Sequence, residues 1–270
     1  MFDSDRDRAL FVSGALGGPF SIWIYTPLRN AITLGSKYLA PTSAELYRMT
    51  FKGGVRFGYT GCASPTIFSG PQFIVMGPAF HQFSSLLGPT LAVLPTALCE
   101  STISYGSQAR NAQKAYNQSC VTASQRMTRL QSPWSPVGAG FAPHVLRNCF
   151  AMSGIRVLYE PFREAIDSAS GGCISGLSLT FAADFCASIV SAACSMPFNQ
   201  CFNYLAVTPD GKGIGAYLKG QYLEEVSGRG VRVSPRFLRD VFMRCAYIAP
   251  QLSTFAIIER ACLAVMVKDA

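Results

Sequence analysis

Uncharged apolar segments alternate along this chain of 270 residues with segments rich in Lys and Arg. Four windows contain at most one Asp, Glu, Lys or Arg, namely residues 9–28, 57–99, 168–209 and 246–258. A helix that crosses ~30 Å of hydrocarbon needs about 20 mostly apolar residues, so the longest window has room for two helices. A helix of a soluble protein normally keeps a charged solvent face. The pattern therefore predicts an all-α integral membrane protein with six transmembrane helices.

The basic residues collect in three long loops, which follow the first, third and fifth apolar segments. The two short connections, near residues 80–85 and 160–170, lack this basic excess. Because basic loops stay on the side from which a protein is not translocated, the long loops share one face of the membrane. A unit of helix, basic loop and helix thus recurs three times. We place these repeats at residues 1–85, 86–170 and 171–270 of one membrane domain.

Composition argues against several function classes. The ten cysteines form no C-x-x-C pair, and the two histidines are too few for a typical metal site or a histidine-based catalytic group. We therefore expect no catalytic residue, no metal, no enzyme activity and no nucleic-acid partner. The first ten residues mix acidic and basic side chains, unlike a secretory signal, so the first helix is expected to remain in the mature protein.

Two motifs bound an apolar stretch that carries three arginines. "GFAPHVLR" occupies residues 140–147, and "YEPFR" occupies residues 159–163. The third repeat offers "VSPRFLR" at residues 233–239, and "ELYRMTFKG" at residues 45–53 precedes the second helix. Together with the three repeats, these motifs resemble the mitochondrial carrier family. The resemblance implies the carrier fold, with six transmembrane helices in three helix–loop–helix repeats of pseudo-threefold symmetry. It also implies a multi-pass protein of the mitochondrial inner membrane.

The resemblance implies substrate-contact positions at Arg147, Asn148 and Arg239. Arg147 followed by Asn148 resembles the pair found in carriers of keto acids and dicarboxylates. A buried arginine costs at least ~2.5–3.5 kcal/mol in hydrocarbon unless it faces a wet cavity or a partner, so a central polar cavity is expected. In the alternative interpretation, these arginines pair structurally with residues such as Asp240, or lie at a shallower depth. Glu160 is 13 residues beyond Arg147, about 20 Å along one continuous helix.

The gates of the family are mostly missing. Carriers close their matrix side with Pro-x-acid-x-x-base motifs on the odd helices. Here the corresponding residues are Pro27, Arg29 and Ile32 in the first helix, Glu100 with Ile103 or Ser107 with Arg110 in the third, and Pro197, Asn199 and Phe202 in the fifth. None of these sets supplies an acid–base pair. On the outer side only the group Tyr159, Glu160 and Arg163 is complete.

Lipid sites of the family are partly kept. An aromatic-base-Gly ending of a matrix helix is matched by Phe51, Lys52 and Gly53, and in part by Lys219 and Gly220. The resemblance implies cardiolipin bound there, with its phosphate at a helix N-terminus. For Lys219, a basic loop at an anionic membrane surface is an equally good interpretation.

The missing gate pairs lead to two hypotheses. Alternating access needs two states of similar energy, each held by its own contacts. A carrier without its charge pairs is expected to have lost this switch and to serve as an accessory subunit of a larger inner-membrane complex, such as a respiratory complex. The alternative is a working carrier of a small carboxylate or keto acid that uses Arg147, Asn148 and Arg239.

Overall fold

The computed structural model describes residues 5–38, 42–208, 213–226 and 230–267, and about 80% of the chain is helical. The long helices are α1 (Asp5–Gly35), α4 (Ala63–Leu87), α5 (Pro89–Ser119), α6 (Phe141–Arg156), α8 (Gly176–Val207) and α10 (Pro235–Met266). The shorter elements are α2 (Ser43–Thr50), α3 (Val55–Gly58), the 3₁₀ turn η1 (Ala123–Gln125), α7 (Tyr159–Ser170), α9 (Ile214–Tyr222), β1 (Leu223–Val226) and β2 (Gly230–Val233).

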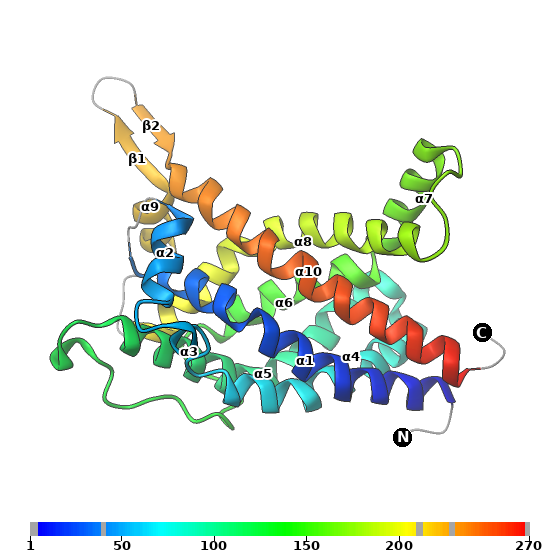
Figure 1. The fold of residues 1–270 in the computed structure, drawn as a ribbon, viewed down its shortest axis with the longest axis horizontal. Helices are drawn as coiled ribbons and strands as arrows, with labels where there is room; N and C mark the ends of the chain where they lie inside the picture. Colours follow the sequence, from blue (N-terminus) through cyan, green and yellow to red (C-terminus); the bar gives the residue numbers. More distant parts are fainter. Residues whose placement is uncertain (1–4, 39–41, 209–212, 227–229, 268–270) are drawn as a thin grey trace.

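The six long helices form a closed ring. Each packs against the next in the order α1, α4, α5, α6, α8 and α10, and α10 packs back against α1. At one end of the ring lie the start of α1 and the finish of α10, and we call this the terminal end (Figure 1). At the other end lie α2, α9 and the strands, and we call this the hairpin end (Figure 1).

Within the described residues, α8, α10 and the part of α1 from Arg8 to Gly35 are long and apolar enough to cross a membrane. This confirms the coarse part of the prediction, a mainly helical chain with membrane-spanning character. Close contact between α1 and α4 depends on Gly14, where an added Cβ would lie 2.6 Å from backbone atoms of Phe73 and Ile74. Small residues at such crossings are typical of helix pairs in membranes.

The prediction of one continuous helix from residue 140 to residue 163 was wrong. The segment divides into α6 and α7, and α6 ends at its C-cap Val157 after 16 residues, about 24 Å. Pro161 supplies the physical reason. Its ring has no N–H to bond the carbonyl of Val157 four residues earlier and would clash with that carbonyl in a straight helix. Helix α7 therefore starts afresh and projects from the ring, with none of its residues buried (Figure 1).

Two prolines lie inside long helices, and one connection expected from the sequence is helical. Pro27 and Pro197 lie inside α1 and α8, which continue to Gly35 and Val207, because contacts with neighbouring helices along their length offset the lost hydrogen bond. The connection predicted at residues 80–85 is helical, since α4 runs on to Leu87. The turn comes at Gly88, whose φ of 78° favours glycine.

The three basic loops have three different structures. The first contains α2 and α3, the second is an irregular loop with η1, and the third contains α9 and an antiparallel hairpin that the sequence did not predict. Glu224 on β1 fixes this hairpin. Its carboxylate accepts from Ser234 Oγ at 2.5 Å, from Arg236 Nη2 at 3.1 Å and from Arg232 Nη2 at 3.1 Å. These donors stabilise the ionised form and lower the pKa of Glu224 to about 2.

Candidate functional site

A small polar cavity of about 50 Å³ lies inside the ring, bordered by α1, α4, α5, α6 and α10. Its polar lining is buried throughout and consists of Arg29, Gln72, Glu100, Gln108, Arg147, Asn148, Arg244, Tyr247 and Gln251. We call it the arginine cavity, because three arginines and a single carboxylate line it. One carboxylate cannot balance three guanidinium groups, so the lining carries an excess of at least two positive charges (three minus one).

Arg147 is held firmly in this cavity by two other helices. Its Nη1 donates to Asn199 Oδ1 at 2.9 Å, its Nη2 donates to Gln108 Oε1, and its guanidinium lies 4.3 Å from the centre of the Phe202 ring. Asn199 and Phe202 were predicted as degenerate matrix-gate positions, and the structure brings both against the predicted substrate contact. Neutral partners and an aromatic face thus hold the charge of Arg147 without neutralising it.

Asn148, a second predicted substrate contact, and Glu100 also line the cavity. Asn148 Nδ2 donates to Ser101 Oγ at 3.0 Å, so its amide is anchored to α5. Glu100, a candidate gate residue, accepts from Gln72 Nε2 at 2.6 Å and makes no ion pair within the described residues. The carboxylate therefore joins α5 to α4 through a hydrogen bond with a neutral amide and not through an ion pair.

Arg29 differs from the other two arginines of the cavity. It is 8% exposed, and its Nε, Nη1 and Nη2 atoms have no hydrogen-bond partner in the described part of the chain. Tyr247 lies in the same cavity and is the main electrostatic partner of the Arg29 guanidinium, and it carries no negative charge when protonated. The sequence placed Arg29 at an acid position of the matrix gate, and only the structure shows that it points its charge into the cavity.

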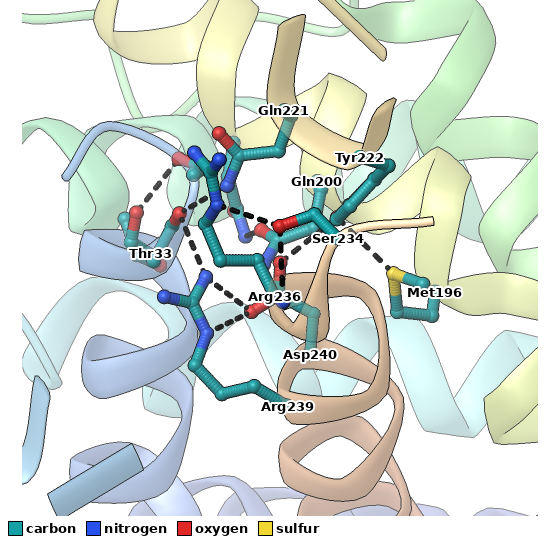
Figure 2. Close-up of polar contacts among 12 residues, drawn as sticks. Thr33, Met196, Gln200, Gln221, Tyr222, Ser234, Arg236, Arg239 and Asp240 are labelled. Atoms are coloured by element: carbon teal, nitrogen blue, oxygen red, sulfur yellow. Dashed lines mark hydrogen bonds and ion pairs between the residues drawn. The ribbon is translucent and has the colours of Figure 1, made fainter. Parts of the chain in front are cut away.

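Arg239 lies outside the lining of the arginine cavity, at the hairpin end. Figure 2 shows its guanidinium beside Asp240, with Nη2 at 2.6 Å from Oδ1. Arg239 Nη2 also donates to the carbonyl of Gly35 at 3.4 Å, and Tyr222 Oη donates to Asp240 Oδ2 at 2.9 Å. The contacts of Arg239 are thus those of the alternative interpretation, structural pairing with Asp240.

Arg244 takes the place in the cavity that was expected of Arg239. It lies five residues later on α10, 4% exposed, and its Nε donates to Ser195 Oγ at 3.2 Å on α8. Sequence reasoning missed it because no motif marks its position. A charged residue in an otherwise apolar stretch was the available signal.

Ion pairs join three helices at the terminal end. Arg156 donates from Nη1 and Nη2 to both carboxylate oxygens of Glu259, at 2.6 and 2.7 Å, and so ties α6 to α10. Arg260 pairs with Asp184, at 3.0 Å between Nη2 and Oδ1, and so ties α10 to α8. These four residues were not predicted. Asp184, the only charged residue of its apolar window, was the signal that a partner was needed.

The predicted outer-gate group sits apart from these bridges. Arg163 Nη1 lies 3.5 Å from Glu160 Oε2 on the same helix, α7, and both side chains are about half exposed or more. Tyr159 contacts the ring, since Arg260 lies 4.0 Å from the centre of its aromatic ring. The Glu160–Arg163 pair is therefore local to α7 and does not link one repeat to another.

Two larger grooves lie at the predicted lipid positions. Lys52 and Gly53 line a groove of about 720 Å³ between the α2–α3 turn and the last turn of α5, while Phe51 is the C-cap of α2. Lys219 lines an apolar groove of about 510 Å³ beside α9 and the hairpin, and Gly220 is not part of it. Because α9 continues to Tyr222, Lys219 and Gly220 do not end a helix as the family pattern requires.

Comparison with known proteins identified no match for this chain. No model of a protein family matches the chain, and no curated protein matches it. Among the described residues there is no group of three or more His, Cys, Asp or Glu side chains that could hold a metal ion. The site is therefore characterised by its own geometry, a small cavity inside the helix ring with excess positive charge.

Proposed function

We propose that this chain is a carrier-like, multi-pass protein of the mitochondrial inner membrane that has lost alternating-access transport and serves as an accessory subunit of a larger complex, such as a respiratory complex. The closed ring of six long helices supports the carrier-like part of the proposal. So do the motif residues Gly140, Pro143 and Arg147, with Gly140 as the N-cap of α6 at a φ of 86°. The five longer ring helices, of 25 to 32 residues, would then span the bilayer, and α6, with 16 residues, would cross most of it.

One observation supports the proposed loss of transport. At the matrix-gate positions, Ile32 and Phe202 are buried at 2% and 1% exposure, and Asn199 is hydrogen-bonded to Arg147. A gate made of apolar contacts and neutral hydrogen bonds has no set of charge pairs to exchange between two states, so a single closed arrangement is favoured. An immobile carrier fold is best explained as a structural part of an assembly.

The grooves beside Lys52 and Lys219 support the lipid part of the proposal. Each combines at least one lysine with apolar wall residues, which suits the phosphate and the acyl chains of cardiolipin. We therefore propose inner-membrane lipids and subunits of the host complex as the partners, with no enzymatic role and no nucleic-acid partner.

A native gel of mitochondria extracted in mild detergent tests the proposal, with the chain located by mass spectrometry. We expect it to migrate in a fixed ratio with the subunits of one large complex. Migration near its own mass, with detergent and lipid only, would refute the accessory-subunit role.

A second candidate function is transport of a small carboxylate or keto acid. The excess positive charge of the arginine cavity favours it. This function predicts saturable uptake into liposomes that Arg147→Ala abolishes and that Arg48→Ala, at an exposed position on α2, leaves intact. Absence of uptake with a correctly folded protein would eliminate the carrier role.

A further inference from the structure

Arg29 presents a buried charge that no carboxylate neutralises in the described part of the chain. In hydrocarbon or a dry protein interior, an unpaired guanidinium costs at least ~2.5–3.5 kcal/mol. Proteins normally avoid this cost by pairing a buried charge or by letting it coordinate an ion. The unpaired Nε, Nη1 and Nη2 atoms of Arg29 therefore indicate a ligand that the protein chain itself does not supply.

The rest of the cavity lining also lacks a negatively charged partner for its arginines. Arg147 and Arg244 are hydrogen-bonded only to neutral groups, and Glu100 is engaged with Gln72. Gln251 also lacks a partner for its Oε1, and an amide can turn to present its NH₂ group instead. The lining thus offers several donors and an excess of positive charge, which is the chemistry that recognises an anion.

The size of the cavity limits the anion. A volume of about 50 Å³ exceeds the ~10–15 Å³ needed for one water molecule but remains small for an organic substrate. Toward the terminal end the cavity is bordered by Phe73, whose ring lies 4.6 Å from that of Phe255 between centres. On the other side, the buried Phe202 ring lies under Arg147. A compact oxyanion fits this space, and a lipid headgroup that carries acyl chains does not.

We infer that the arginine cavity binds one inorganic oxyanion of the phosphate or sulfate class as a permanent structural ligand. The guanidinium fork matches two oxygens of such an anion, and the three arginines come from three different helices, α1, α6 and α10. The anion would tie these three helices together inside the ring. This inference goes beyond the accessory-subunit proposal and holds whether or not the chain joins a complex.

Thermal unfolding of the purified full-length protein in detergent tests this inference. Trp23 and Trp134 provide the fluorescence signal, and phosphate or sulfate replaces gluconate at constant ionic strength. We expect a saturable rise of the midpoint by about 5–10 °C at a hundredfold excess over Kd. Arg29→Gln should abolish this rise, and Arg48→Gln, the exposed control, should retain it.

A second measurement does not depend on the stability of any variant. Wild-type protein purified without exchange of its bound ions is denatured, and the released phosphate and sulfate are measured by ion chromatography. About one equivalent per chain is expected. The inference is overturned if neither anion raises the midpoint and none is released, which would mean that the cavity holds water. It is equally overturned if Arg29→Gln keeps the full rise, or if only a dicarboxylate such as malonate produces it.

Discussion

Removal of the Glu259 charge should destabilise the terminal end of the ring. In the wild type, Glu259 binds both terminal nitrogens of Arg156, and the two side chains are only 9% and 15% exposed. Glu259→Gln leaves Arg156 buried without its counter-charge, and breaking a buried pair costs ~3–5 kcal/mol. Because this pair borders an open cavity of about 370 Å³, we take the lower end, about 3 kcal/mol. For a chain of this size that corresponds to a fall of about 6–12 °C in the unfolding midpoint.

The control is Glu160→Gln, which removes a carboxylate from the same end of the molecule. Its pair with Arg163 is exposed and local to one helix, so the midpoint should change by no more than about 2 °C. The double variant Arg156→Gln/Glu259→Gln should recover at least half of the loss, because the cost comes from the uncompensated charge. Fluorescence-detected thermal unfolding in detergent measures all four proteins. Equal shifts in the two single variants, or no recovery in the double variant, would refute the reasoning.

Three further predictions concern other parts of the fold. Glu224→Gln should loosen the hairpin. Because the pKa of Glu224 is lowered in the wild type, its carboxylate stabilises the hairpin fully above pH ~4.5, and this stabilisation is lost as the pH falls toward 2. Protection of the β2 amides from hydrogen exchange should decrease in the variant, and in the wild type at low pH. Unchanged protection in both cases would contradict this. Gly14→Ala should lower the stability by about 1–3 kcal/mol, because the added Cβ meets the α4 backbone. Gly70→Ala is the control, since its Cβ would lie 3.8 Å from the nearest neighbour, and it should be neutral or slightly stabilising. Thermal unfolding measures both variants, and the opposite order of stability would contradict the prediction. Tyr105→Phe removes the 2.7 Å hydrogen bond from the hydroxyl to the carbonyl of Ala139 and should lower the free energy of unfolding by about 1 kcal/mol. Limited proteolysis should then cut the 120–140 loop faster than in the wild type. An unchanged rate of cleavage would contradict this.

Part of the candidate site could be predicted from sequence because its residues are near known landmarks. Arg147 and Asn148 follow Pro143 in one helix start, and both line the arginine cavity as expected. Arg239 was selected by the same motif logic in the third repeat, yet it pairs with its neighbour Asp240. A motif fixes the position of a residue along its helix, but it does not tell which of two charges on that helix faces the cavity.

The break between α6 and α7 shows another limit of sequence reasoning. Pro161 was present in the sequence, and its effect on the carbonyl of Val157 is a local one that could have been predicted. The resemblance to a family pattern, which runs through this position, favoured one continuous helix instead. A local steric rule was here more informative than the pattern.

By itself, the sequence determined the membrane-like, mainly helical character of the chain. The cost of placing a segment in hydrocarbon is a sum over its own residues, so the scarcity of charge in a window decides it without knowledge of neighbours. The same rule required a partner for Asp184. Only the tertiary structure decided that this partner is Arg260, 76 residues away, and that Arg29 has no carboxylate partner among the described residues. Pairing of buried charges depends on which helix faces meet when the ring closes, and that follows from contacts between distant segments rather than from any one of them.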